Sequence, residues 1–181
     1  QPLSMITTAA SGIKLKKELD LLEDKDHEES LDAIIESAKY LSSTIDDFRY
    51  FFSPNKNRTI LHSNDLFEKV FNLLESEYNT KNIQVIKNIK EVEIYTYENE
   101  LIQVMINILN NAKDELIKIE NYENRYIFIE LHVEENNMII SIKDNAGGIP
   151  ENILDRIFEP YFTTKHQSQG TGIGLYMSEE I

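Results

Sequence analysis

The chain has 181 residues, 41% of them hydrophobic, which is enough for one ordinary domain or a small domain with a helical appendage. It carries 18 Lys and Arg against 32 Asp and Glu, and a net charge of −14 argues against binding to nucleic-acid phosphates. The absence of cysteine excludes disulfides, thiolate zinc sites and cysteine nucleophiles, and no apolar run approaches the length of a membrane span.

The first third of the chain is predicted to form a helical hairpin. Residues 1–22 carry an irregular apolar stripe, and the acidic stretch EDKDHEE (23–29) is expected to be the turn. In the second helix, apolar residues alternate three and four positions apart, as in the seam of packed helices: Leu31, Ile34, Ala38, Leu41, Ile45, Phe48 and Phe52. Two helices cannot cover such a face, so we expect two copies to pair into a four-helix bundle.

The rest of the chain mixes helical and strand patterns. Pro54, within SPNKN (53–57), is expected to end the second helix. Helices are predicted over 65–78 and 98–120, and strands over 83–86, 93–97, 126–133 and 138–144. This order predicts an α/β fold class, specifically an α+β sandwich with helices on one face of a mixed sheet. We expect two domains, a hairpin over 1–54 and a second domain over 58–181.

Three asparagines lie within the 98–120 helix, although Asn is a mediocre helix former. At about 100° per residue, Asn107, Asn111 and Asp114 share a face beside an apolar one, and Asn110 falls between the two. Such a stripe is ordinarily a solvated surface. The alternative is that an amide oxygen binds Mg²⁺, which takes few protein oxygens and shares its other positions with water and phosphate.

Five of the six glycines lie within 147–174. DNAGGIP (144–150) follows a strand, where an Asp could accept from an exocyclic amine and glycines would let a flat ring approach, but these are also common turn residues. GTGIGL (170–175) opens the last helix, where backbone N–H groups could bind an anion. It matches neither the dinucleotide fingerprint nor the P-loop. The segment 150–169 between them is a candidate lid.

Together and in order, the asparagine helix, DNAGGIP, IFEPYFTTK (157–165) and GTGIGL resemble the four sequence boxes of the ATP-binding domain of sensor histidine kinases. QPLS (1–4) is similar to the tail of the box that carries the phosphoacceptor histidine, and the hairpin resembles the dimerisation and phosphotransfer helices. The resemblance implies a phosphotransfer domain truncated at its N-terminus and an ATP-binding domain truncated at its C-terminus.

The resemblance implies a role for each matching residue. Asn111 would bind Mg²⁺, Asn107 would be a catalytic polar contact near the phosphates, and Asp144 would accept from the adenine amine. The other residues implied to bind ATP are Gly148, Ile149, Lys165, Gly170, Thr171, Gly172, Ile173, Gly174 and Leu175. The sequence departs from the family at Ala146, where many relatives have glycine, and at Asp114, where some have a basic residue facing the phosphates.

The implied function is that of a cytoplasmic protein-histidine kinase of a two-component system. It would transfer the γ-phosphoryl of ATP to a histidine just upstream of Gln1, and then to the aspartate of a response-regulator receiver domain. The implied assembly is a homodimer, with any membrane attachment made by parts of the protein outside this chain.

Two alternatives stay open. One is an ATP-binding or ATP-hydrolysing module of the same superfamily without kinase activity. The hydrolases place a general-base Glu where this chain has Asn107, which cannot take a proton from water, so this residue favours the kinase. The other is a scaffolding module that no longer uses ATP.

The four histidines are predicted to be surface or structural residues. His27 lies in the predicted turn, His62 near a strand edge, His132 within a strand and His166 in the lid. None lies in the first helix, where a phosphoacceptor belongs. We therefore expect that the 181-residue chain does not phosphorylate itself on histidine.

Overall fold

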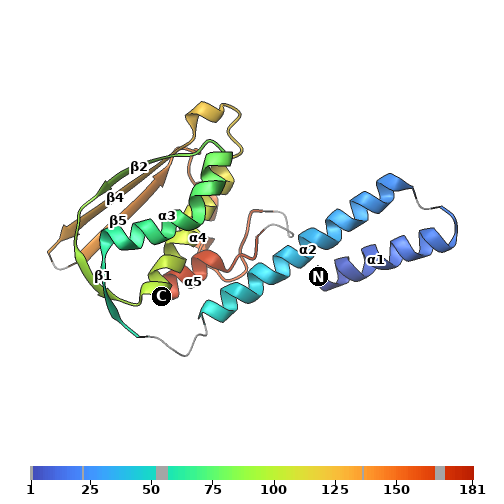
Figure 1. The fold of residues 1–181 in the computed structure, drawn as a ribbon, viewed down its shortest axis with the longest axis horizontal. Coiled ribbons are helices and arrows are strands. Elements are labelled where there is room, and N and C mark those ends of the chain that lie inside the picture. Colours follow the sequence, from blue (N-terminus) through green and yellow to red (C-terminus); the bar gives the residue numbers. More distant parts are fainter. Residues whose placement is uncertain (1, 22, 52–56, 136, 166–169) are drawn as a thin grey trace. The chain divides into compact units, whose positions relative to one another are not determined.

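The computed structural model describes residues 2–21, 23–51, 57–135, 137–165 and 170–181 (Figure 1). The chain divides into two compact units, one comprising Gln1–Phe52 with Glu159–Ile173 and the other Ser53–Phe158 with Gly174–Ile181. Helices and a mixed sheet make up the described residues, which confirms the predicted α+β class. Among the described helices, none combines the length and apolar character of a membrane span.

A helical hairpin dominates the first unit: α1 (Pro2–Glu18) and α2 (Asp24–Phe51). Lys16 Nζ lies 2.7 Å from Asp26 Oδ1 and thereby ties the two helices together near the turn. This hydrogen bond holds the pKa of Asp26 below its usual value. The prediction of a turn over 23–29 was wrong, because α2 begins at Asp24. Acidic residues in a first helical turn are stabilised by the helix dipole, which explains why this stretch is helical.

The predicted apolar seam of α2 is largely exposed on the single chain. Ser37, which lies outside the seam, is the residue of α2 buried to 3% exposure, whereas Leu31 is 40% and Ile45 is 63% exposed. The side chains of Phe48 and Phe52 lie outside the described residues. Ile34 and Leu41 of the seam are half-buried, so the hairpin covers part of the seam and leaves Leu31, Ala38 and Ile45 exposed.

The second unit contains two small sheets. Strand β2 (Gln84–Ile89) pairs in parallel with β4 (Tyr126–Glu134), and β4 pairs antiparallel with β5 (Asn137–Asp144). Separately, β1 (Thr59–His62) pairs antiparallel with β3 (Glu93–Thr96). The helical elements are α3 (Ser63–Thr80), α4 (Glu98–Leu116), α5 (Gly174–Glu180) and the 3₁₀ turns η1 (Tyr122–Asn124) and η2 (Glu151–Arg156).

The core of this unit lies between one face of the three-stranded sheet and helices α3 and α4 (Figure 1). Alternate residues of β4 point inward, so Ile127, Ile129 and Leu131 are almost completely buried. Tyr78 on α3 donates its hydroxyl to the backbone oxygen of Leu109 on α4 at 3.0 Å. Burial raises the pKa of Tyr78 above its usual range, so this hydroxyl remains a donor.

Arg125 joins the ends of the two long helices to the start of β4. Its side chain is buried, and Nη1 donates to the backbone oxygen of Lys81, the C-cap of α3, at 2.8 Å. Nη2 donates to the oxygens of Ile117 and Ile119 at the end of α4, at 2.9 and 2.7 Å. The guanidinium carbon also lies 4.7 Å from the ring centroid of Tyr122. One cation thus satisfies three carbonyls that the helix ends leave without partners.

Candidate functional site

Asn107, a member of the asparagine stripe, makes hydrogen bonds within α4 and to α5. It is half-buried on α4, and its Oδ1 accepts from Gln103 Nε2, one helical turn earlier, at 3.1 Å. Its Nδ2 donates to the backbone oxygen of Gly174 at 3.2 Å and faces Ser178 Oγ at 3.4 Å. The asparagine helix is therefore bonded directly to α5, the helix opened by the second glycine segment.

The other polar residues of the stripe also lie on α4. Asn111 is half-buried one turn beyond Asn107, and Asp114 is half-buried as well. Asn110, which had no assigned role, accepts from Lys113 Nζ at 3.1 Å, and the same ammonium pairs with Glu77 of α3 at 2.8 Å. Asn110 therefore belongs to a contact between α3 and α4.

The turn that follows β5 presents a carboxylate next to open space. Asp144 is half-buried, and its Oδ1 accepts from the backbone nitrogen of Ala146 at 2.9 Å. Gly147 and Gly148 have φ angles of 106° and 82°, and a Cβ added at either would meet no atom within 4 Å. Ile149 is 48% exposed. The backbone of the turn is thus open on the side where a Cβ of Gly147 or Gly148 would lie.

Asn145 anchors this turn to the sheet. Its Oδ1 accepts from the backbone nitrogen of Tyr126 at 2.8 Å, and its Nδ2 donates to the backbone oxygen of Asn124 at 3.0 Å. Its own backbone nitrogen donates to Tyr126 O at 3.3 Å. These bonds continue the β4–β5 pairing one residue past Asp144. The backbone of Asp144, at the end of β5, is therefore held in place on both sides.

The segment Glu159–Ile173 belongs to the first unit. Its two ends meet at a neck formed by Tyr161 and Gly172. Tyr161 N donates to Gly172 O at 2.9 Å, and both residues have positive φ angles, of 67° and 65°. Lys165 N donates to Thr163 Oγ1 at 3.1 Å, and Ile173 N donates to Thr171 Oγ1 at 3.3 Å. Gly170 lies close to Thr163, because an added Cβ would come within 2.8 Å of that hydroxyl.

The candidate site residues therefore fall into separate groups. Asn107, Asn111, Asp144, Gly148, Ile149, Gly174 and Leu175 belong to the second unit, whereas Lys165, Gly170, Thr171, Gly172 and Ile173 belong to the first. Within the second unit the structure brings Asn107 and Gly174 into contact. Gln103, Asn145 and Ser178, which the sequence did not single out, contact or anchor these residues. Their bonding partners are set by the fold, so neither the DNAGGIP stretch that contains Asn145 nor the helix that contains Gln103 revealed these contacts.

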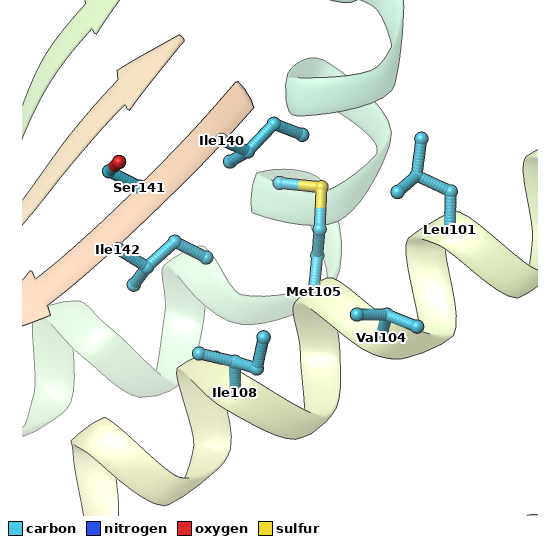
Figure 2. A pocket seen from close by; sticks show the side chains of 7 residues that line it. All are labelled: Leu101, Val104, Met105, Ile108, Ile140, Ser141 and Ile142. Carbon is cyan, nitrogen blue, oxygen red and sulfur yellow. The ribbon is translucent and has the colours of Figure 1, made fainter. Parts of the chain in front are cut away.

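An apolar hollow of about 440 Å³ lies between α4 and β5. Figure 2 shows side chains of the helix facing the strand across it; the lining residues are Leu101, Val104, Met105, Ile108, Ile140, Ser141 and Ile142. Ser141 is its one polar residue, and none of the candidate nucleotide contacts lines it. This hollow lacks the polar groups that a triphosphate requires.

The donor chemistry of the second unit fits a nucleotide with its metal. No group of three or more His, Cys, Asp or Glu among the described residues could hold a metal ion on its own. Mg²⁺ suits such a protein when a single amide oxygen, such as that of Asn111, is combined with phosphate oxygens and water.

Two of the four histidines lie near glutamate carboxylates. His132 Nε2 lies 3.2 Å from Glu134 Oε1, and His62 Nε2 lies 3.9 Å from Glu93 Oε1. His27 is exposed in the first turn of α2, so its predicted place in an inter-helix turn was wrong. His166 lies outside the described residues.

Comparison with known proteins identifies the family. The model of the histidine kinase-, DNA gyrase B-, and HSP90-like ATPases matches residues 96–181, a span that includes all four boxes. The nucleotide-free catalytic domain of the histidine kinase ThkA is 30% identical, with a TM-score of 0.58, over 69% of this chain and 79% of the ThkA chain. This chain belongs to the histidine kinases. Its matched part is therefore an ATP-binding domain of that kind.

Two other histidine kinases align with different shares of the chain. The two-component sensor PprA of Pseudomonas aeruginosa is 40% identical over 84 residues, which are 45% of this chain and 9% of PprA. The histidine protein kinase SaeS of Staphylococcus aureus is 28% identical, over 99% of this chain and 52% of SaeS. The chain thus spans about half of SaeS and much less of PprA.

One solved structure contains a second protein. ThkA in complex with the response regulator TrrA matches with a TM-score of 0.68 at 22% identity, over 91% of this histidine kinase chain and 47% of the ThkA chain. At this identity the match supports the fold of nearly the whole chain, including the helical hairpin.

Proposed function

We propose that this chain is the cytoplasmic transmitter portion of a sensor histidine kinase, which binds ATP and Mg²⁺ and phosphorylates a histidine. The observation that carries the proposal is the contact of Asn107 with Gly174, 67 positions apart. It joins two of the four sequence boxes in space. Boxes that had lost their function would not need to retain complementary polar groups at this contact.

The residue roles in this proposal follow the chemistry of each group. Asn111 supplies an oxygen to Mg²⁺ without adding negative charge near a triphosphate, and Asp144 accepts from the adenine amine beside Gly148 and Ile149. The glycine-rich segment contributes its backbone to the phosphates through Gly170, Thr171, Gly172, Ile173, Gly174 and Leu175. Lys165 would add a charge-assisted contact.

Phosphoryl transfer would then proceed by positioning. A neutral imidazole nitrogen would attack the γ-phosphorus as the bond to the β–γ bridging oxygen breaks, ADP would leave, and the other ring nitrogen would lose its proton to solvent. Mg²⁺, held by Asn111, would neutralise charge on the phosphates. The phosphoacceptor is a histidine upstream of Gln1 in this proposal. The phosphoryl group would pass next to an aspartate of a response-regulator receiver domain, a partner class suggested by the ThkA–TrrA complex.

Dimerisation through the helical hairpin forms the second part of the proposal. The exposed Leu31 and Ile45 of α2, together with exposed Leu3 and Leu15 of α1 and Leu19 in the following turn, supply apolar surface for a second copy. Replacing both Leu41 and Ile45 by Asp should split the dimer, because a buried unpaired charge is costly. Light scattering at micromolar concentration tests this, and a monomeric unchanged protein would contradict it.

Nucleotide titration tests the ATP site. In the complete protein we expect Mg²⁺-dependent binding of ATP, a weaker metal dependence in Asn111→Ala, and a reduced preference for adenine over guanine in Asp144→Ala. If Asp144→Ala binds both nucleotides as the unchanged protein does, the placement of adenine is wrong. If the unchanged protein binds no ATP, the module does not use ATP.

Phosphoprotein formation separates the kinase from an ATP hydrolase. With labelled ATP, the kinase should yield an acid-labile, base-stable phosphoprotein, and replacing the upstream histidine by Gln should abolish the label while ATP binding remains. Phosphate release without any phosphoprotein would favour the hydrolase alternative. Labelling of the 181-residue chain itself, at His27 or His166, would overturn the placement of the phosphoacceptor.

A further inference from the structure

The first residue of α5 accepts hydrogen bonds from a side chain of α4 and from a side chain of α5 itself. Gly174 is the residue at which the chain re-enters the second unit after the segment Glu159–Ile173. Its carbonyl oxygen accepts from Asn107 Nδ2 at 3.2 Å and from Ser178 Oγ at 2.9 Å. A carbonyl can only accept, so the group of Asn107 that faces it must be the NH₂. This fixes the orientation of an amide whose two ends are otherwise hard to distinguish.

The orientation of Asn107 determines the rest of this polar cluster. Because its NH₂ faces α5, its Oδ1 faces back along α4, where Gln103 Nε2 donates to it at 3.1 Å. The same NH₂ approaches Ser178 Oγ at 3.4 Å, which leaves that hydroxyl free to donate to Gly174. Gln103, Asn107, Ser178 and the carbonyl of Gly174 thus form one directional chain of donors and acceptors.

We propose that Gln103 and Ser178 are positioning residues for the phosphate end of the nucleotide and act through Asn107. The inference rests on the proposed ATP-binding function and adds two residues to which the family resemblance assigned no role. Gly174 is covalently joined to the segment that ends at Ile173, so holding its carbonyl fixes where the phosphate-binding backbone ends. The adenine end depends on other bonds, those of Asp144 to Ala146 and of Asn145 to Tyr126.

This separation predicts different effects at the two ends of the ligand. Weakening the cluster should reduce affinity for ATP, whose phosphates need the glycine-rich backbone, and leave affinity for adenosine unchanged. A general loss of folding would reduce both affinities together. Comparing ATP with adenosine therefore distinguishes a positioning role from a merely structural one.

The test uses calorimetric titration of the complete protein with ATP–Mg²⁺ and with adenosine. Ser178→Ala and Gln103→Ala should each weaken ATP binding about three- to tenfold, the range expected for one hydrogen bond, with adenosine affinity unchanged. Ser178→Thr, which keeps the hydroxyl, should bind ATP normally. Asn110→Ala is the matched control, because Asn110 lies on the same helix but accepts from Lys113 instead.

A double variant tests whether both residues act through Asn107. Residues of one hydrogen-bond network are not additive, so Gln103→Ala with Ser178→Ala should lose less affinity than the product of the two single losses. If Ser178→Ala shows no unfolding transition in a thermal melt, the comparison of ATP with adenosine affinity is made with Gln103→Ala.

Two results would overturn the inference alone: unchanged ATP affinity in both single variants, or equal losses for ATP and adenosine. Absence of ATP binding by the unchanged protein would instead overturn the proposed function.

Discussion

The two glycine-bearing turns use glycine for different physical reasons. Gly147 and Gly148 need only their backbone angles, because a Cβ at either would meet nothing within 4 Å. Gly172 needs both its angle and its lack of a side chain, since an added Cβ would lie 2.5 Å from the backbone carbon of Tyr161 and 2.7 Å from Phe162 O. A glycine in a motif therefore does not reveal whether conformation or space requires it.

The turns also differ in what holds them in place. The first is anchored by the side chain of Asn145 on the backbones of Tyr126 and Asn124. The second is held by backbone contact at its neck, where Tyr161 N donates to Gly172 O. Tyr161 accepts a positive φ to make this contact, and its side chain remains 70% exposed. Side-chain substitutions should thus loosen the first turn, and Cβ additions should disrupt the second.

The largest effect is expected for Gly172→Ala. The clash is with backbone atoms, so no side-chain rotation can relieve it, and the left-handed conformation adds strain. We expect ATP affinity in the complete protein to fall by more than about tenfold, measured by titration. Gly12→Ala in α1 is the matched control, because an added Cβ there meets nothing and Ala favours a helix by about 1 kcal/mol. Near-normal ATP binding by Gly172→Ala would show that ATP binding does not depend on the close contact between Tyr161 and Gly172.

Next in size is Asn145→Ala. The change would leave the backbone nitrogen of Tyr126 without its acceptor at a half-buried position, which costs about 1–3 kcal/mol in the free energy of unfolding. Asn145→Asp keeps that acceptor and loses the donor to Asn124, so its cost should be smaller. Urea denaturation of the three proteins measures the order. Equal stabilities of Asn145→Ala and the unchanged protein would contradict the anchoring role.

A smaller effect is expected at Gly148. Ala should destabilise by about 1–2 kcal/mol through its φ of 82° alone, and Asn should cost less because it tolerates the left-handed region. Thermal denaturation of Gly148→Ala and Gly148→Asn gives this difference. If Gly148→Asn is as stable as the unchanged protein yet loses ATP, then space for the ligand, and not the angle, is what this glycine provides.

The smallest effect is expected for Gly174→Ala. An added Cβ would lie 3.6 Å from Asn107 Cγ, an ordinary contact, and Ala is the better helix former. Stability should be unchanged or higher by up to about 1 kcal/mol in denaturation, with ATP binding retained. A tenfold loss of ATP affinity with intact stability would show that a phosphate occupies the space beside Gly174.

Periodicity predicted the elements that bury a continuous face. The strand predicted over 126–133 corresponds to β4, and the helix predicted over 98–120 corresponds to α4. In both elements the buried residues recur with the period of the apolar residues in the sequence. The strand β1 was missed, since four residues with one buried side chain give no pattern. Part of the candidate lid over 150–169 forms a 3₁₀ turn, Glu151–Arg156.

The site was predictable only as far as its motifs extend. Glycines and asparagines in ordered boxes were visible in the sequence, whereas the partners of Asn107 were not. Ser178 lies 71 positions away, and its distance to Asn107 follows from the packing of α5 on α4. Local spacing carries no information about such a contact.

Arg125 has a consequence for how this unit responds to its surroundings. The three carbonyls it binds carry no net charge, so these contacts depend less on ionic strength than a pair of opposite charges does. Because the side chain is also buried, the corner where α3, α4 and β4 meet should respond weakly to added salt. Exposed ion pairs such as Lys118–Glu115 should weaken first.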